Sequence, residues 1–524
     1  MKKPYDIIII GAGNNGLTAA AYLAKAGKSV LVLEKRDVLG GAAATEELWP
    51  GFHANTGAED AAMFQDDIVK DLFLKMNGLE FRHSPVAIFA PQPNAPALTL
   101  YHDIIQSQAS IAQFSPADAQ KYPTFVAQVN QFSGILREML LHAPPDITEL
   151  GVNELMSWGG VGLKLRRQGG KAMMAFLRVL PMPAREYLDE WFETDALKGA
   201  LGLDAIIGTM QGPWSAGTTL QFFYQHVNGF LSRRVVLGGM GALSAALANA
   251  ARQNGADIRT GVGVANIQVV DGQATAILLE NGDQIPANAI LSSADPRQTL
   301  FDFVGPQLLE PRLMRAVRNI IYRGSTAKLI LALDNLPQFI GQTEEEQLHG
   351  RIRLAPSLTA IEKAYDAAKH GRFSPQPILD ITIPTLTDGT LTPAGKHLMN
   401  ITIRYTPYHL ADGDWESERE GLVTAVLNTL ATFTPSPDRL ITSSPHHLIT
   451  PADYAHTYSL PEGSIFHGQM SLDQLLMMRP MPGWGQYRTP ITNLYLCGAG
   501  THPGGGVTGA PGYNAAQVVL NQLD

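Results

Sequence analysis

The chain has 524 residues, of which 45% are hydrophobic and 17% charged, and its formal net charge is −9. This composition is typical of a globular protein of several domains, and the negative charge argues against a nucleic-acid partner. The one cysteine, Cys497, excludes a disulfide within the chain and a C-x-x-C redox pair. No apolar run is long enough to span a membrane, and no secretory signal precedes the first predicted strand, so we expect a cytoplasmic protein.

The first 41 residues have the pattern of a nucleotide-binding βαβ unit. Asp6 to Ile10 predicts a buried strand, Asn15 to Ala26 a helix, and Ser29 to Leu33 a second buried strand. The turn between the first strand and the helix fits G-x-G-x-x-G, and Glu34 closes the second strand. Strand, glycine turn, helix, strand and acid therefore occur in the order that a dinucleotide site requires.

Each glycine of this turn has a different predicted role. Gly11 permits the tight turn, Gly13 lets a pyrophosphate approach the backbone, and Gly16 lets the helix pack close to the strand. The free N–H groups of the helix N-terminus, which include that of Asn15, would meet the phosphates. Glu34 would accept the hydroxyl hydrogens of a ribose. The alternative, a glycine-rich turn in an ordinary α/β domain, does not explain Glu34.

The residues after Glu34 bear on the choice between NAD and FAD. Lys35 and Arg36 are followed by Gly40 and Gly41, which would let the chain double back toward the pyrophosphate. This E-x-R-x-x-x-G-G pattern resembles that of FAD enzymes of the amine oxidase and phytoene desaturase type. The continuation AAATEELWPGFHANTG is similar to the carotenoid desaturases and desaturase-like β-carotene ketolases. The resemblance implies FAD as the cofactor.

We therefore predict an α/β fold with a Rossmann-like FAD-binding domain that is discontinuous in sequence. That domain would comprise residues 1–57, 235–297 and 485–524. An α+β substrate domain would comprise residues 58–115 and 298–484, and residues 116–234 would form a helical lid. Within the substrate domain the patterns predict a helix over 61–76, strands over 86–90, 327–333, 378–383 and 397–404, and a helix over 415–432.

Residues 235–297 return to a nucleotide-domain pattern. Two glycines at 238 and 239 precede a predicted helix over 242–253, and strands are predicted over 258–264, 267–270 and 274–279. Asp271-Gly272 has the composition of a hairpin turn. The family resemblance implies that the backbone of Val264 lies against the adenine.

A strand over 494–497 is followed by the glycine-rich sequence GAGTHPGGGVTGAPG and a predicted helix from Ala510 to about Asn521. This segment resembles the closing flavin motif of the same family. The resemblance implies flavin contacts from this loop, at Gly498, Gly500, Thr501, Gly509 and Ala510. The N-terminus of the last helix would then stabilise negative charge on the reduced ring.

No catalytic acid–base pair is evident. His502, inside the glycine-rich loop, and His226 are the catalytic candidates, and for His502 the alternative is a turn residue bonded to the backbone. Trp214, Phe222, Phe223 and Tyr224 form an aromatic group that would either line an apolar tunnel or belong to the core. His446-His447 has no partner at metal-ligand spacing, so no metal site is predicted.

The stretch from Ser157 to Arg185 carries six basic residues and no acid, among interleaved apolar residues. The basic residues are Lys164, Arg166, Arg167, Lys171, Arg178 and Arg185. Such a pattern fits peripheral contact with an anionic membrane surface, and equally an exposed helix face whose charges are paired elsewhere.

Together these features predict an FAD-dependent oxidoreductase of the phytoene desaturase-like type. The resemblance implies hydride transfer between the flavin and a long apolar or isoprenoid substrate. Two alternatives stay open: a flavin oxidase of soluble amines or alcohols, and an FAD-holding protein that acts through partners. The sequence carries no signal of oligomeric state.

Overall fold

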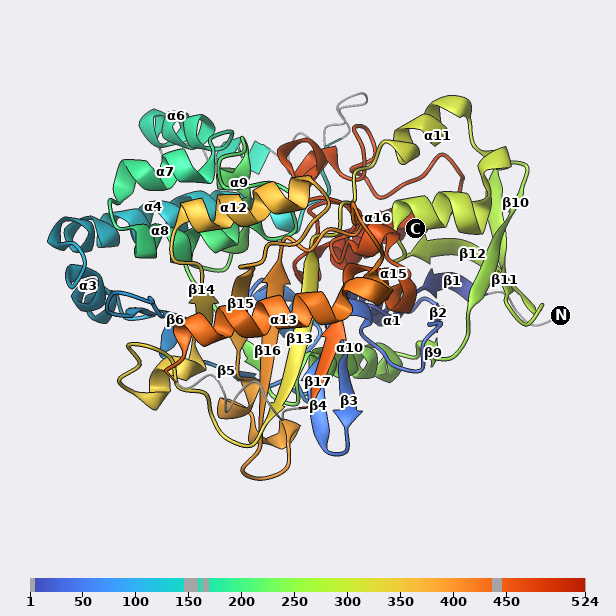
Figure 1. Cartoon of the computed structure of the whole chain (residues 1–524). Coiled ribbons are helices and arrows are strands. Elements are labelled where there is room, and N and C mark those ends of the chain that lie inside the picture. Colours follow the sequence, from blue (N-terminus) through green and yellow to red (C-terminus); the bar gives the residue numbers. More distant parts are fainter. Residues whose placement is uncertain (1–4, 146–158, 161, 164–168, 436–444, 524) are drawn as a thin grey trace.

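The computed structural model describes residues 5–145, 159–160, 162–163, 169–435 and 445–523. It has the predicted mixed α/β fold, built on two seven-stranded sheets. The first sheet lies at the right in Figure 1, the second at the centre, and a group of helices at the upper left.

The first sheet has the strand order β10-β11-β12-β1-β2-β9, with β18 paired to β12. Its strands are β1 (Tyr5–Ile10), β2 (Val30–Leu33), β9 (Asp257–Arg259), β10 (Val264–Val270), β11 (Gln273–Leu279), β12 (Gln284–Ser292) and β18 (Leu494–Leu496). The second half of β12 pairs in parallel with β1 and β18, while its first half pairs antiparallel with β11. Segments far apart in the sequence thus share one sheet, and the exact domain boundaries remain a prediction.

Helix α1 (Asn14–Lys25) packs against both α10 (Met240–Gln253) and α16 (Ala510–Leu523) beside this sheet. Small residues let them approach closely, since a Cβ on Gly512 of α16 would lie 2.0 Å from the carbonyl oxygen of Asn15 in α1. Ala515, Ala516 and Val519 of α16 are fully buried in the same core. The C-terminal helix is therefore part of the N-terminal βαβ unit in space.

The second sheet has the order β17-β13-β16-β15-β14-β6-β7. Its strands are β6 (Val86–Ala90), β7 (Leu98–Tyr101), β13 (Thr326–Leu333), β14 (Arg351–Leu354), β15 (Ile378–Thr382), β16 (His397–Arg404) and β17 (His446–Ile449). The strands predicted here are confirmed. Helix α13 (Trp415–Phe433) lies along this sheet (Figure 1), and its Leu422, Val426 and Leu430 share a core with Leu329, Ile352 and Ile401 of the strands.

The helical segment contains α4 (Pro116–Leu140), α6 (Gly170–Val179), α7 (Ala184–Trp191), α8 (Asp195–Gly202) and α9 (Thr218–Gln225). Its core is aromatic: Phe222 and Phe223 of α9 contact Phe125, Phe132 and Tyr187. Trp214 is 44% exposed. The aromatic group is therefore mainly core, which is one of the two predicted alternatives.

Further α-helices in the described part of the chain are α2 (Asp66–Asp71), α3 (Ile104–Ala112), α11 (Pro311–Arg318), α12 (Leu358–Lys369) and α15 (Pro451–Tyr458). The short strands β3 (Thr45–Trp49) and β4 (Phe52–Asn55) form one hairpin, and β5 (Phe81–Arg82) pairs with β8 (Val235–Val236). Among the residues with a described placement, no helix is both long and apolar enough to cross a membrane.

The helix predicted over 61–76 is wrong in extent, since α2 covers only Asp66–Asp71. The reason is tertiary: the side chain of Asn228 donates to the carbonyl oxygens of Ala62 and Phe64, and Arg234 also donates to Phe64. Those carbonyl oxygens therefore accept hydrogen bonds from side chains outside the segment, and not from the N–H groups of a longer helix. The strand predicted over 258–264 is also interrupted, because Gly261 takes a positive φ of +66° between β9 and β10.

Candidate cofactor and substrate site

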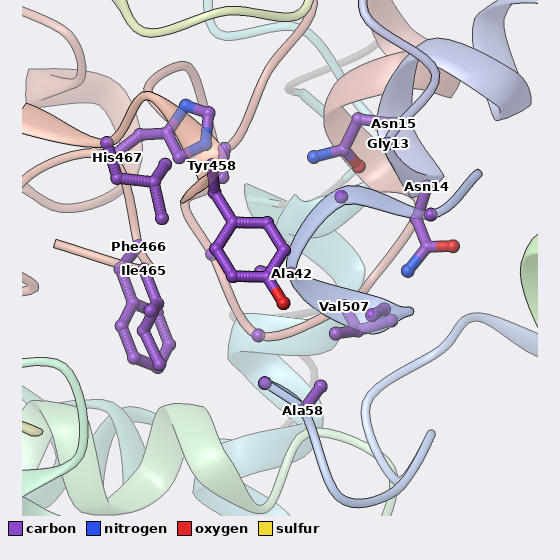
Figure 2. Close-up of a pocket in the computed structure, with 18 of the residues that line it drawn as sticks. Gly13, Asn14, Asn15, Ala42, Ala58, Tyr458, Ile465, Phe466, His467 and Val507 are labelled. Carbon is purple, nitrogen blue, oxygen red and sulfur yellow. The ribbon is translucent and has the colours of Figure 1, made fainter. Parts of the chain in front are cut away.

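A cavity of about 440 Å³ lies between the two sheets. Its lining joins the glycine turn with residues 57–63, the second sheet, residues 457–467 and the C-terminal glycine-rich loop. Figure 2 shows Gly13, Asn14 and Asn15 on one side and Ile465, Phe466 and His467 on the other, with Tyr458 between them. A ligand extended through this cavity would contact both the nucleotide-type unit and the second sheet.

The glycine turn leaves space for a ligand. Gly11 has φ +91°, and a Cβ on Gly16 would lie 2.2 Å from the carbonyl oxygen of Gly11, so both positions need glycine for the fold itself. Gly13 differs: its backbone is extended, and the described atom nearest to a Cβ there would be Ser293 Oγ, at 3.9 Å. The described chain does not itself require glycine at 13, whereas a pyrophosphate against the backbone would.

The helix that follows is open to an anion at its N-terminus. No described side chain caps α1, whose N-cap residue is Gly13. The uncapped N–H groups of the first turn and the helix dipole favour negative charge at this point. Asn15 also lines the cavity, and its Oδ1 is buried without a hydrogen-bond partner among the described residues. The glycine turn therefore fits the pyrophosphate of a dinucleotide.

Glu34 is buried beside the glycine turn. Its Oε2 accepts the N–H of Ala12 at 2.7 Å, and its Oε1 accepts the N–H of Arg36 at 3.0 Å. A carboxylate offers about four acceptor positions, so each oxygen still has one for a ribose hydroxyl. The bond to Ala12 also holds the turn in place, a second role that the sequence did not indicate.

Replacing Glu34 by alanine should weaken FAD binding by about 1–3 kcal/mol, the range for losing hydrogen bonds to a charged group. The dissociation constant can be measured by titrating apoprotein with FAD. Glu280→Ala is the comparison, because that acid also lines the cavity but pairs with the exposed Lys35. If both variants lose the same binding free energy, or if Glu34→Ala binds FAD as tightly as wild type, Glu34 does not bind the ribose.

The other predicted adenosine-side residues line the same part of the cavity: Lys35, Arg36, Gly40, Gly41 and Val264. Arg36 pairs with Glu46 at 2.6 Å and lies over the ring of Tyr458, 4.6 Å from its centroid. Val264 begins β10 instead of ending the preceding strand. The structure brings these residues together, and their contacts with FAD remain predictions.

The C-terminal glycine-rich loop reaches the cavity through residues other than those predicted. Its lining residues are Ala499, Gly505, Gly506 and Val507. Gly498 and Gly500 face Ser293 and Pro296, and Gly509 faces Phe64 and Ile68. Thr501 Oγ1 donates to the carbonyl oxygen of Gly498, and the N–H of Ala510 donates to Thr508 Oγ1. Runs of glycine indicated the loop, but only the fold decides which of its residues face inward.

The two catalytic candidates differ in position. His502 is absent from the cavity lining, and its Nε2 lies 3.0 Å from the carbonyl oxygen of Met139. Burial lowers the pKa of His502 to about 4. This geometry favours the structural interpretation of His502, in which the ring is bonded to the backbone.

His226 does line the cavity. Its Nδ1 accepts the N–H of Leu231 at 3.2 Å, so in the neutral ring the proton is on Nε2, which lies 3.6 Å from Asp204. Burial lowers the pKa of His226 to about 4, so the ring is neutral at physiological pH. A neutral imidazole in this tautomer can donate a hydrogen bond, but Nδ1 is not free to act as a base.

His467 also lines the cavity, and it takes an unusual backbone conformation, with φ +54°. Its Nδ1 is buried without a hydrogen-bond partner in the described part of the chain, and burial lowers its pKa to about 4. Ile465 and Phe466 line the cavity beside it, so residues 465–467 are part of the site, although the sequence favoured His502.

A charged sheet face is the feature that the sequence did not reveal. In the register of the second sheet, Lys328 pairs with Thr402, Thr402 with Asp380, and Asp380 with Arg353, a row straight across four strands. Arg351 and Arg404 lie on the same face, while alternate residues are apolar and pack toward α13. The alternation was visible in the strands, but the polar face is normally the solvent side. Here it lines the cavity.

The basic stretch predicted to touch membranes lies partly outside the described residues, since 157–158, 161 and 164–168 are among those without a described placement. Arg178 pairs with Glu190, and Arg185 pairs with Asp189 and lies over Trp214. Lys171 is exposed, as are the apolar Met174 and Leu177 of α6. Membrane contact by this stretch remains a prediction. No group of three or more metal-ligating side chains occurs among the residues that the structure describes.

Comparison with known proteins identifies the family. The profile described as flavin containing amine oxidoreductase matches residues 16–520. The chain belongs to this family. It is 34% identical to the rat pyridine nucleotide-disulfide oxidoreductase domain-containing protein 2, over 100% of this chain and 94% of the rat protein. The family membership confirms that this chain is an FAD-dependent oxidoreductase.

More distant relatives span different substrates. One of the subunits of limonene dehydrogenase from Castellaniella defragrans is 28% identical over 99% of this chain and 95% of that protein. A 4,4'-diapophytoene desaturase of Staphylococcus aureus is 23% identical, over 96% and 95%. The structure of putrescine oxidase bound to putrescine superposes with a TM-score of 0.61 at 15% identity, covering 99% of this chain and 98% of that one. The resemblance to the desaturase group is confirmed, and so is the shared fold.

Proposed function

We propose that this chain is a dehydrogenase that oxidises a substrate with a large apolar body by hydride transfer to FAD. The observation that carries this proposal is the mixed lining of one continuous cavity. Next to the glycine turn and the C-terminal loop, the cavity has the apolar side chains of Met63, Ile207, Leu231, Ile465 and Phe466. An apolar substrate body packed there would exclude water from the reacting carbon.

FAD, when bound, supplies the hydride acceptor. The protein residues then hold the substrate and fix the polarity around it. His226 would donate from Nε2–H, which has no hydrogen-bond partner among the described residues. The N–H of Leu231, bonded to Nδ1, holds the ring in that orientation. The backbone around Gly505 is fixed by Tyr224, whose hydroxyl donates to the Gly505 carbonyl oxygen at 3.0 Å.

A wholly apolar polyene fits this cavity less well than the family resemblance implies. Lys328, Arg351 and Arg404 of the second sheet line the same space, and burying hydrocarbon against charged groups displaces the water that solvates them.

A soluble amine, the alternative substrate, has the opposite difficulty. The acids of the wall already pair with basic residues: Glu59 with Lys328, Asp60 with Arg351, and Asp204 with Arg353. A substrate ammonium would have to displace one of them.

Anaerobic reduction of the purified holoprotein tests the proposal. Loss of the oxidised-flavin absorbance would be followed with limonene, with putrescine and with geranic acid, an isoprenoid acid. We expect reduction by an isoprenoid compound and none by putrescine. Reduction by putrescine alone would identify an amine oxidase, and a flavin that stays oxidised with every class of substrate would favour a protein that acts through partners.

A further inference from the structure

The cavity wall formed by the second sheet and residues near it is rich in buried charge. The basic side chains on the lining are Arg233, Lys328, Arg351, Arg353 and Arg404, and the acidic ones are Glu59, Asp60 and Asp204, with Asp380 behind them. Basic side chains therefore outnumber acidic ones in this cluster. A buried cluster with an uncompensated charge is costly unless a ligand balances it.

Four of the basic residues have acidic partners. Lys328 pairs with Glu59, Arg351 with Asp60 at 2.8 Å and Asp380 at 2.7 Å, Arg353 with Asp204 at 2.6 Å, and Arg404 with Asp380 at 3.3 Å. Burial alone would raise the pKa of Asp380, but Arg351, Arg353 and Arg404 together lower it to about 2. Asp380 is therefore an anion, and these four cations are compensated.

Arg233 is the exception. It is only 7% exposed, and no carboxylate among the described residues lies within ion-pair distance of its guanidinium group. Within the same described part of the chain, its Nη1 donates to the carbonyl oxygen of His349 at 2.5 Å, and its Nε has no partner. Burial, then Arg351, lowers the pKa of Arg233 to about 10, so the side chain is still charged at neutral pH.

We propose that Arg233 binds a carboxylate on the substrate, so that the substrate is an acid with an apolar body. This inference rests on the proposed function and names the substrate class for the same cavity. Leu231 and Ile207 line the cavity with Arg233, and they would contact the hydrocarbon part next to that carboxylate. The guanidinium group can donate a charge-assisted hydrogen bond to such a carboxylate, which is roughly twice as strong as a bond between neutral groups.

The phosphates of FAD are not the partner of this arginine in our proposal. The glycine turn and the uncapped N-terminus of α1 account for them, and both follow strand β1 of the first sheet. The charged groups that act on Arg233 are Arg351, Asp60, Asp380 and Glu59, all in or beside the second sheet. Arg233 thus belongs to the substrate side of the cavity.

Ligand binding to the oxidised holoprotein tests the proposal without turnover. Octanoate, octanamide and octylamine would be titrated while the flavin absorbance spectrum is recorded. We expect octanoate to bind most tightly, and Arg233→Gln to weaken octanoate by about tenfold or more, the effect of losing a charge-assisted hydrogen bond. Octanamide binding should change little, and Arg233→Lys should restore part of the preference for octanoate.

Arg234→Gln is the matched control, because the neighbouring arginine is outside the cavity lining and pairs with Asp66. It should keep the wild-type preference for octanoate.

Each of four outcomes would overturn the proposal: equal binding of the three ligands, tighter binding of octylamine, no spectral change with octanoate, or equal effects of the two glutamine variants. If Arg233→Gln fails to hold FAD, Arg233→Lys decides: a retained preference for octanoate supports the proposal, and a lost preference with bound FAD contradicts it. Failure of every substrate to reduce the flavin would overturn the proposed function but leave this binding result standing.

Discussion

Replacing Gly13 by valine is expected to yield folded protein without flavin. The backbone at Gly13 is extended, which valine adopts readily, and apart from its chain neighbours the described atom nearest to a Cβ there would be Ser293 Oγ at 3.9 Å. The fold therefore has room for a Cβ at this position, and the expected loss falls on the pyrophosphate that would occupy the same space. Flavin content per protein, measured after denaturation, should fall from near one to a small fraction.

Two further glycine variants separate cofactor loss from misfolding. Gly134→Val places the same side chain in α4, away from the cavity, where a Cβ would have no described atom within 4 Å apart from its chain neighbours and the backbone of its own helix; this variant should keep its flavin. Gly16→Ala should lose both flavin and stability, since its Cβ would lie 2.2 Å from the Gly11 carbonyl oxygen. If the Gly13→Val protein is yellow and has full flavin content, the pyrophosphate does not bind at this turn.

The second large effect is expected at Lys328, where replacement by methionine should destabilise the protein by about 3–5 kcal/mol, the range for breaking a buried ion pair. Lys328 is 1% exposed and pairs with Glu59. Its Nζ also donates to the carbonyl oxygens of Asn55 and Gly57 at 2.7 and 2.8 Å. Methionine leaves a buried carboxylate and two carbonyl groups without their partner.

The loss at Lys328 can be assigned by a double variant. Lys328→Met combined with Glu59→Gln removes the stranded charge, and glutamine can still accept the bonds from Thr382 and Asn400. We expect this pair to recover more than half of the loss, as measured by the midpoint of urea unfolding. An unchanged midpoint in the single variant, or no recovery in the double one, would show that the ion pair contributes little. Because Gly57 and Ala58 line the cavity, the single variant should also bind FAD more weakly.

The packing of the C-terminal loop also determines where an added charge could act on the flavin. A Cβ at Gly509 would lie 2.9 Å from both Phe64 and Ile68, so aspartate there would enter the protein core and not the cavity. A substitution meant to alter the polarity at the flavin belongs instead at Val507, which lines the cavity (Figure 2).

The sequence by itself determined the nucleotide-binding unit and the cofactor. Glycine spacing, an apolar strand and the terminal acid are local features, and they specify a βαβ turn through sterics that act within about 30 residues. The same holds for β13, β15, β16 and α13, whose periodic patterns were sufficient to predict them. The family motifs at both ends of the chain then distinguished FAD from NAD.

Only the tertiary structure decided which wall faces the substrate. The alternation in β14, β15 and β16 predicts one polar and one apolar face, but a strand pattern cannot say whether its polar face meets water or a cavity. The sequence could not decide between His502 and His226 for the same reason. His502 bonds to Met139, which is far away in the chain. His226 contacts Leu231 and Asp204, which the fold brings to it. Contacts between residues far apart in the chain fix side-chain direction, charge balance and pKa, and these decide the chemistry of the site.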